Sequence, residues 1–303
     1  MPLGRRVAGR LIASAIARKN RKGYLAMMKY YEDKTVTNEQ QEVLDYLRKH
    51  NFDMFPYEYL HAQRPSDVEV HFNQEIGLPY ILLNGKRLYY PEDATRAAIQ
   101  QVFHIDQTLS QHPRSPHCYL ADGLTVDADD IVVDCGAADG NFSLDVVDKV
   151  KKIYLFEPAE SWQKPLAATF APWKDKVVIV RKLLSDETNE DCVSLDDYFA
   201  NKDETPTMIK MDIEGFEACA LHSAKRLLKA PNGIRKAAVC TYHRQDDEQI
   251  LGAFLRECGF NVTPSKGYML FFYDDDVKPP YFRRGVIRAK KQSLSHLHQP
   301  LQQ

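Results

Sequence analysis

The residues most able to do chemistry lie in a glycine turn near the middle of the chain. A β-branched run at 131–133 ends in an acid, and two glycines then precede an amphipathic stretch. This is the pattern of a strand, a tight turn and a helix. Glycines let the backbone of such a turn approach a ligand closely at the carboxyl edge of a parallel sheet. The candidate ligand-binding residues here are Asp134, Gly136, Asp139, Gly140, Asn141 and Phe142.

The acids of this turn favour a ligand that carries positive charge. The glycine spacing differs from the dinucleotide fingerprint G-x-G-x-x-G, and the sequence contains no G-x-x-x-x-G-K-[ST] phosphate loop. One acid precedes the first glycine and another precedes the last, so their carboxylates would repel a pyrophosphate. S-adenosylmethionine (SAM) carries an ammonium and a sulfonium. We therefore predict SAM as the cofactor, rather than NAD or ATP.

A second acid indicates a nucleoside site. Glu157 ends the apolar run 153–156, 23 residues after Asp134, and Pro158 follows it. An acid at the tip of the second strand hydrogen-bonds ribose hydroxyls in nucleoside sites. The alternatives are a general nucleoside-binding domain, or an acid that caps the next helix.

Three ionisable residues alternate in one apolar segment. Lys210, Asp212 and Glu214 share one face of the predicted strand, and burying them without a role would be costly. We expect Asp212 to lie beside the methionine part of SAM or the acceptor, and Lys210 to pair with a carboxylate. A structural salt-bridge network is the alternative.

With these segments the chain resembles the FkbM-type methyltransferases. Their hallmark is a strand ending in K-x-D-I-E-G-x-E before a helix, and residues 210–217 carry it. Further segments similar to the family are 88–91, 115–120, 193–199, 240–244, 259–260 and 265–270, so the resemblance covers residues 68–290. It implies a class I fold and a SAM-dependent O-methyltransferase, often one that acts on sugars of glycans or natural products. It does not name the acceptor.

A hydroxyl acceptor must lose its proton, so the predicted reaction needs a base or a metal. His243 ends the strand next to that of Asp212, and imidazole titrates near neutral pH. We assign the catalytic roles to His243 and Asp212, with a capping role as the alternative for the histidine. A divalent metal held by Asp212 and Glu214 is the rival mechanism. Because no second His or Asn completes such a site in the sequence, we predict no metal.

Four further residues are weaker candidates. Ser185 and Asp186 follow the third strand, where the resemblance implies an adenine site, and Asp186 is the candidate for the adenine amino group. Ser115 and His117 precede the first core strand and are candidates to close over SAM or the acceptor, together with Glu214. A buried turn is the alternative for Ser115 and His117.

Composition and charge limit the other classes of function. The chain has 303 residues, a net charge of −2 and six cysteines without C-x-x-C pairing, which fits reduced thiols in the cytoplasm. No run of eighteen apolar residues predicts a membrane span.

Residues 1–34 carry a net charge of +7, so the remainder is near −9, and this acidity argues against nucleic acid. A basic amphipathic helix at 5–31 either lies on an anionic membrane surface or packs on the domain.

The coarse pattern predicts an α/β domain behind an α+β extension. The extension, 1–115, contains a helix at 38–50 capped by Asn38, a hairpin around Asn84-Gly85 and a helix that opens at Asp93. The methyltransferase domain is expected at 116–290, and 291–303 as a disordered tail. The predicted strands are 131–135, 153–157, 176–181, 207–213, 236–242, 260–264 and 268–274, with helices at 141–149, 161–170, 217–229 and 246–258. The resemblance implies that they form a seven-stranded Rossmann-like sheet.

The sequence therefore predicts an O-methyltransferase that acts on a saccharide or other small molecule. A methyltransferase-like module without catalysis is an alternative, although the intact acids and glycines at 134–157 argue against it. A metal-dependent small-molecule O-methyltransferase is the other alternative. The oligomeric state stays open.

Overall fold

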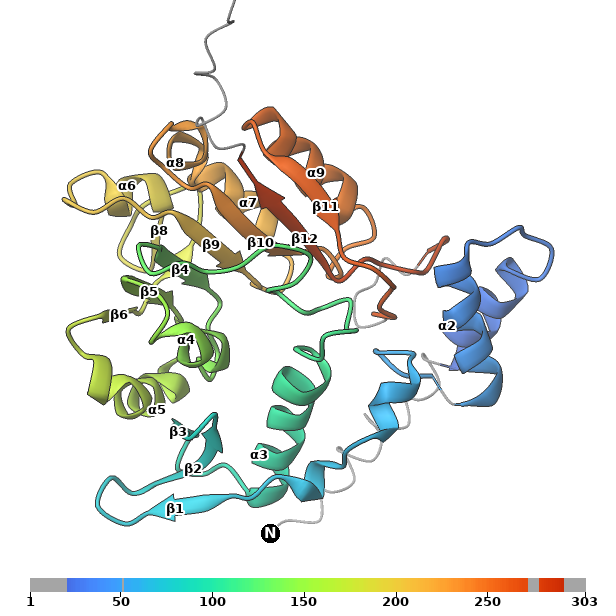
Figure 1. The fold of residues 1–303 in the computed structure, drawn as a ribbon, viewed down its shortest axis with the longest axis horizontal. Coiled ribbons are helices and arrows are strands. Elements are labelled where there is room, and N and C mark those ends of the chain that lie inside the picture. The colour runs from blue at the N-terminus through green and yellow to red at the C-terminus, as the bar shows by residue number, and fades with distance from the viewer. Residues whose placement is uncertain (1–20, 51, 272–277, 292–303) are drawn as a thin grey trace, which may run out of the picture.

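A seven-stranded sheet forms the centre of the computed structural model, which describes residues 21–50, 52–271 and 278–291 (Figure 1). The strand order is β11-β12-β10-β9-β4-β5-β6, and neighbours pair in parallel except for β12, which is antiparallel to β10 and β11. The strands are β4 Ile131–Cys135, β5 Lys152–Phe156, β6 Val177–Val180, β9 Met208–Met211, β10 Lys236–Cys240, β11 Asn261–Pro264 and β12 Val286–Lys290. The predicted Rossmann-like fold class is confirmed.

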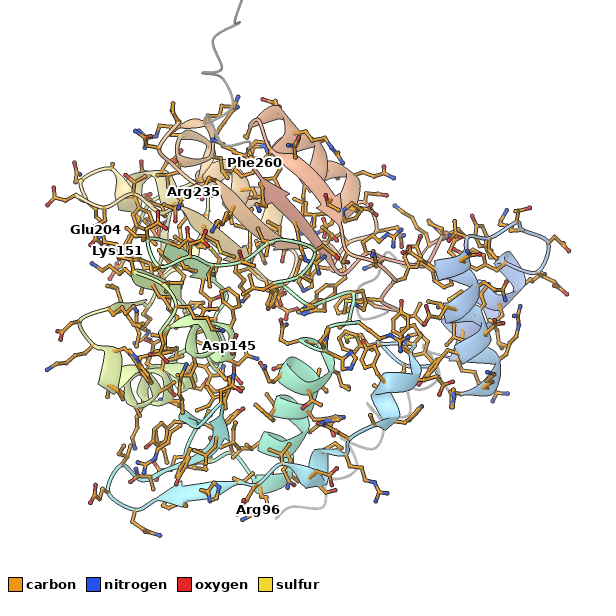
Figure 2. The ribbon with its side chains drawn as sticks, viewed as in Figure 1. Arg96, Asp145, Lys151, Glu204, Arg235 and Phe260 are labelled. Atoms are coloured by element: carbon orange, nitrogen blue, oxygen red, sulfur yellow. The ribbon has the colours of Figure 1, made fainter. Side chains whose placement is uncertain are left out.

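Alternate residues of these strands pack into two apolar cores. Val132 and Met208 face the core that includes helices α4 and α5, whereas Val133 and Ile209 face the core that includes α7 and α9. The helices around the sheet are α4 Asn141–Val146, α5 Glu160–Phe170, α6 Leu195–Phe199, α7 Glu217–Ser223, α8 Lys225–Lys229 and α9 Asp247–Glu257. Figure 2 shows side chains filling the space between these helices and the sheet.

The extension shares the first of these cores instead of forming a separate one. Phe55, Leu88 and Ile99 belong to the same apolar cluster as Val132 of β4. The predicted hairpin is confirmed, since the turn residues Asn84-Gly85 adopt φ values of 52° and 78°. The elements of the extension are α2 Asn38–Lys49, η1 Glu58–His61, η2 Pro65–Asp67, β1 His71–Asn73, β2 Leu78–Leu83, β3 Lys86–Tyr89, α3 Arg96–Phe103 and the π-helix η3 His104–Leu109.

Two helices of the extension begin at other residues than predicted. The side chains and backbones of Thr37 and Gln40 form a reciprocal capping box, so Thr37 caps α2 where we predicted Asn38. Helix α3 begins after Thr95, whose hydroxyl accepts from a backbone N–H, and not at Asp93. In both places a threonine hydroxyl supplies the cap that we assigned to another residue.

The last strand along the chain is β12, and the strand predicted at 268–274 does not form over 268–271, the part of it that the structure describes. Met269 forms an isolated bridge, and the N–H of Leu270 donates to the carbonyl of Met54 in the extension (3.1 Å), so this segment leaves the sheet. Residues 286–290 instead pair with both β10 and β11. Both segments are apolar enough for a strand, and their pairing partners decide which of them joins the sheet.

The two ends of the chain carry predictions that the structure does not reach. Residues 21–30 are helical, but 1–20 of the predicted basic segment lie outside the described residues, as do 292–303 of the predicted tail. Among the described residues, no helix is both long and apolar enough to span a bilayer.

Candidate functional site

A cavity of about 250 Å³ lies at the carboxyl ends of β4, β9 and β10. The glycine turn after β4 forms one wall, and Phe55 and Asp106 of the extension form part of another. The predicted site residues that line it are Gly136, Asp139, Asn141, His117, Lys210, Asp212 and Glu214. Seven residues from distant parts of the sequence therefore meet at one edge of the sheet, as parallel strand ends predict.

The glycine turn lies in direct contact with the end of β9. Gly136 has a φ of +74°, and a Cβ built on it would lie 1.9 Å from the carbonyl oxygen of Asp212. Gly140 has a φ of +83°, and a Cβ there would lie 2.9 Å from Leu166 and Phe170 of α5. Only glycine fits at either position, so the turn is packed between the two strands and α5.

Glu157 holds this turn through its backbone. Its Oε2 accepts from the N–H of Ala138 (2.9 Å), and its Oε1 accepts from the N–H of Ala159 (2.8 Å). The residue is 7 % exposed. The acid at the end of β5 therefore lies beside the glycine turn, where we predicted it, and it fixes the conformation of Ala138.

Asp134 and Lys210 form a buried ion pair beneath the turn. Lys210 Nζ lies 3.0 Å from Asp134 Oδ1 and donates to the Gly136 carbonyl (2.8 Å), while Ser143 Oγ donates to Asp134 Oδ2 (2.6 Å). Burial disfavours the charged lysine, but Asp134 and Asp212 outweigh it and raise the pKa of Lys210. Lys210 thus pairs with a carboxylate as predicted, and Asp134, which is fully buried, supports the turn from below.

Asp139 is connected to the extension. Its Oδ1 accepts from the N–H of Asn141 (3.0 Å), and its Oδ2 accepts from the hydroxyl of Tyr90 (3.1 Å). Burial raises the pKa of Asp139 to about 6. Burial and the nearby Asp139 and Asp212 raise the pKa of Asp106 to about 8. The cavity therefore contains carboxyl groups that stay ionised and others that hold a proton near neutral pH.

Asp212 is the most strongly hydrogen-bonded carboxylate of the cavity. Tyr119 donates to its Oδ2 (2.7 Å) and Tyr242 to its Oδ1 (3.2 Å). His117 Nε2 lies 3.3 Å from Oδ2, and His243 Nε2 lies 3.5 Å from Oδ1. Burial alone would raise the pKa of Asp212, but the hydrogen bond and charge of His117 outweigh it, with Lys210 and His243 adding to the lowering. Asp212 is thus ionised at neutral pH.

His243 lies behind Asp212 rather than on the cavity wall. Its side chain is 4 % exposed, and its Nδ1 lies 2.9 Å from Glu217 Oε1. Burial lowers the pKa of His243, but the facing carboxylates of Glu217, Asp212 and Glu214 raise it above its usual value. His117 is the histidine that lines the cavity. This geometry argues against the predicted role of His243 as the base.

Several other candidates lie away from the cavity. Ser115 is buried, and its Oγ accepts from the N–H of His117 (3.2 Å), so it supports the histidine. Asp186 is exposed, and with Ser185 it faces Cys219 Sγ (3.4 Å) rather than the cavity. Phe142 is buried and packs edge-on against Tyr119. The other candidates that do not line the cavity are Asp134 and Glu157, which support the turn, and Gly140 and Pro158.

Three ionisable cavity residues were not among the candidates predicted from the sequence. Tyr119 and Tyr242 lie within the segments that resemble the FkbM family, and each precedes or follows a histidine by one or two positions. No sequence motif marks Asp106, because the π-helix η3 brings it to the cavity from 30 residues before the glycine turn. The two tyrosines could have been identified by their position beside His117 and His243.

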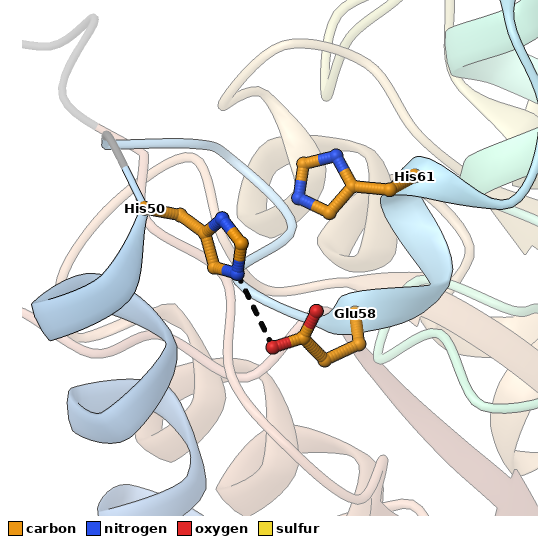
Figure 3. A group of neighbouring side chains, drawn as sticks. All are labelled: His50, Glu58 and His61. Carbon is orange, nitrogen blue, oxygen red and sulfur yellow. Dashed lines mark hydrogen bonds and ion pairs between the residues drawn. The ribbon is translucent and has the colours of Figure 1, made fainter.

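Four groups of described side chains could hold a metal ion, and two of them are His117, Asp212 and Cys240, and Asp127, Asp129 and Asp130. The other two bear on the argument. Asp212, Glu217 and His243 offer ligand atoms within 4.8 Å of one another beside the cavity. His50, Glu58 and His61 do so in the extension, where His50 Nε2 lies 3.2 Å from Glu58 Oε1 (Figure 3). The side chains of His50 and Glu58 are 31 % and 62 % exposed, so water competes for these ligands. The group of Asp212, Glu217 and His243 is mostly buried and adjoins the cavity.

Comparison with known proteins identifies one domain. Residues 180–262 match the model of the methyltransferase FkbM domain, which confirms the resemblance found in the sequence. The methyltransferase FkbM from Methylobacillus flagellatus KT is 19% identical, with a TM-score of 0.46, over 64% of this chain and 51% of that one. The chain thus spans about half the length of that structure. No curated protein matches the chain.

Two further solved structures are similar to part of the chain. A precorrin-6y C5,15-methyltransferase from Geobacter metallireducens GS-15 is 15% identical, with a TM-score of 0.38, over 55% of this chain and 84% of that one. A putative methyltransferase from Streptococcus mutans, solved in complex with SAH, is 16% identical, with a TM-score of 0.36, over 55% of this chain and 90% of that one.

Proposed function

We propose that this chain transfers a methyl group from SAM to a hydroxyl of an acceptor bound in the cavity. The observation that carries the proposal is the contact between the glycine turn and the end of β9, which brings Asp139, His117 and Asp212 around one cavity. The matched methyltransferase FkbM domain supports the reaction class. When bound, SAM supplies an activated methyl group, so alignment of acceptor and donor dominates the rate.

The residues around the turn fit a cationic donor. The absence of a Cβ at Gly136 lets the turn lie against the backbone of Asp212, and Asp139 and Asn141 line the cavity beside it. Glu157 fixes the turn on the side of β5. The carboxylates of Asp139 and Asp212 attract a sulfonium and an ammonium, and Asp139 is buried while the side chain of Asp212 is 18 % exposed.

We propose that His117 accepts the proton of the acceptor hydroxyl and that Asp212 stabilises the charged imidazole. His117 lines the cavity, and its Nε2 lies 3.3 Å from Asp212 Oδ2, so the ionised carboxylate stabilises the imidazolium that forms. This assignment replaces His243 as the base, because His243 lies behind Asp212. Asp212 then acts through His117 and keeps its predicted place in the site.

The walls of the cavity favour a saccharide as the acceptor. The oxygens of Glu214 and Asp106 can accept hydrogen bonds from sugar hydroxyls, and the rings of Phe55 and Phe271 offer apolar faces. A hydroxyl-rich ring presents both kinds of surface. A cytosolic location, and membrane contact through residues 1–34, stay predictions.

Two measurements test the proposal. Calorimetry should show one SAM per chain, and Glu157→Gln should weaken that binding because the turn loses a charged acceptor. Mass spectrometry after incubation with SAM and a panel of saccharides should then show a mass gain of one methyl group. A chain that does not bind SAM is no methyltransferase. A chain that binds SAM but methylates no hydroxyl compound is a binding module.

A further inference from the structure

We infer that Asp212 and His243 hold a divalent cation beside the cavity, with the exposed side chain of Glu214 turning onto the cation as a third ligand and Glu217 orienting His243. A catalytic role for the cation depends on the proposed function. The binding site itself is inferred only from the arrangement of these four side chains. In the sequence, Asp212 and Glu214 were candidate metal ligands without a third partner. The structure supplies His243 as that partner.

The His243 ring lies in an environment that suits a ligand better than a hydrogen-bonded side chain. Nε2 has no hydrogen-bond partner of acceptable geometry among the described residues, although the side chain is 4 % exposed. Nε2 lies 3.5 Å from Asp212 Oδ1 and 3.6 Å from Glu214 Oε2. These separations exceed a normal N–H···O hydrogen bond of about 2.7–3.2 Å. Two ligands on one cation, each with a bond of about 2.0–2.2 Å, are held roughly 3.0–3.6 Å apart.

Glu217 lies on the opposite side of the ring. Its Oε1 lies 2.9 Å from His243 Nδ1 and also accepts from the N–H of Ile213 (2.9 Å), while its buried Oε2 has no partner among the described residues. A metal-binding histidine usually donates its other N–H to a carboxylate, which fixes the ring. Glu217 therefore fits a hydrogen on Nδ1, which leaves the lone pair of Nε2 facing Asp212 and Glu214.

The charge of the cluster also favours a cation. The carboxylates of Asp212, Glu214 and Glu217 surround one imidazole, and the nearest lysine, Lys210, is already paired with Asp134. A single protonated histidine would neutralise one of the three carboxylates. Asp212 also faces His117 Nε2 (3.3 Å), and a divalent cation would balance the carboxylates that the two histidines leave.

Access and ligand type indicate which cation fits. The side chain of Glu214 is 83 % exposed, so the cluster opens to solvent on that side. One imidazole with carboxylate oxygens suits Mn²⁺ or Zn²⁺. Asp212 and Glu214 also line the cavity, so the cation would contact an acceptor hydroxyl and ease the loss of its proton to His117.

Electron paramagnetic resonance of Mn²⁺ with the full chain tests the inference without any assay of activity. The metal-stripped protein should remove one Mn²⁺ per chain from the free-ion signal, and the bound ion should show coupling to one nitrogen. Asp212→Asn and His243→Gln should weaken binding at least tenfold, and His243→Gln should also remove the nitrogen coupling. Glu217→Gln should weaken binding by about 10–100-fold, as loss of an outer carboxylate does.

Asp186→Asn is the matched control, because it removes an exposed carboxylate outside the cavity and should leave Mn²⁺ binding unchanged. Melting temperatures establish that each variant is folded. Absence of saturable Mn²⁺ and Zn²⁺ binding, or binding that survives in folded Asp212→Asn, overturns the inference. In that case His243 is a protonated partner of its carboxylates.

Calorimetry with SAM separates this inference from the proposed function. Binding of SAM without any binding of Mn²⁺ or Zn²⁺ would leave the proposed function standing and refute the metal site. Binding of Mn²⁺ through Asp212 and His243 without any affinity for SAM would establish the metal site and refute the proposed function.

Discussion

Gly136 lies so close to Asp212 that a Cβ at position 136 would be 1.9 Å from the Asp212 carbonyl oxygen. The turn that we assign to the donor and the strand end that carries the charged residues are therefore in backbone contact. A shift of either segment moves the other. This contact explains why the residue that begins the turn is a glycine with a φ of +74°.

Gly136→Ala should destabilise the protein and abolish SAM binding. The added methyl group collides with the backbone of Asp212, and the positive φ adds strain of about 1–3 kcal/mol. Urea unfolding and calorimetry measure the two effects. Gly259→Ala is the matched control, because Gly259 has a φ of +88° but a Cβ built on it would meet no atom within 4 Å. If both variants lose equal stability, the contact with Asp212 has no effect.

Lys210→Met should lower the free energy of unfolding by about 3–5 kcal/mol, because it leaves the fully buried Asp134 without its cation. The double variant with Asp134→Asn should recover part of that loss, since the uncompensated charge is gone. Denaturant titrations of both variants and the wild type provide the comparison. A double variant no more stable than Lys210→Met would contradict this account of the pair.

His117→Gln should lower kcat by about two to four orders of magnitude and leave SAM affinity within a few-fold of the wild type. The amide can still reach Asp212, but it cannot accept the proton of the acceptor hydroxyl. Rates at saturating SAM, together with calorimetry, separate the two effects. Near-normal turnover in folded His117→Gln would show that another group accepts the proton.

Asp130 should make the stability of the protein depend on pH. It is fully buried beside Lys236 Nζ (2.7 Å) and Arg235 (3.1 Å; Figure 2). Burial would raise the pKa of Asp130, but the hydrogen bond from Lys236 outweighs it and lowers the pKa below its usual value. The stabilisation is therefore present above the unfolded value of about 3.9 and is lost as the pH falls through the lower folded value.

Asp130→Asn should consequently destabilise the protein by about 3 kcal/mol at pH 7, and by progressively less as the pH falls below about 4. Urea unfolding of wild type and variant across this range gives the difference. Asp129→Asn removes an exposed partner of the same arginine and should have little effect at any pH. A constant difference between wild type and Asp130→Asn would mean that Asp130 contributes by shape alone.

Local patterns were sufficient for most of the sheet. The runs before Asp134 and Glu157 are short, apolar and followed by turn residues, so they became β4 and β5 where predicted. The pair Asn84-Gly85 fixed the hairpin, because its two positive φ values suit few other residues. These elements are determined by residues close together in the sequence, so local sequence patterns predict them.

Elements that depend on distant partners were not predictable in the same way. The segment 268–274 is the more apolar of the two, since 286–290 contains Arg288 and Lys290, yet 286–290 forms β12 because it pairs with β10 and β11. Likewise, both His117 and His243 follow from sequence patterns, but only the packing of the extension decides which one lines the cavity. Local sequence patterns do not show how the extension packs on the sheet.

The cavity is built from two stretches that have different tasks. Phe55, Asp106 and His117 come from residues before 118, whereas Gly136, Asp139 and Asn141 come from the turn after β4. The methyl donor is the same for every acceptor, so selection can alter the first stretch while the second stays fixed. Relatives with exchanged leading segments should therefore differ in acceptor preference at equal donor affinity. A chimaera that exchanges part of the leading segment but keeps Tyr90 and His117 is the direct way to redirect the enzyme.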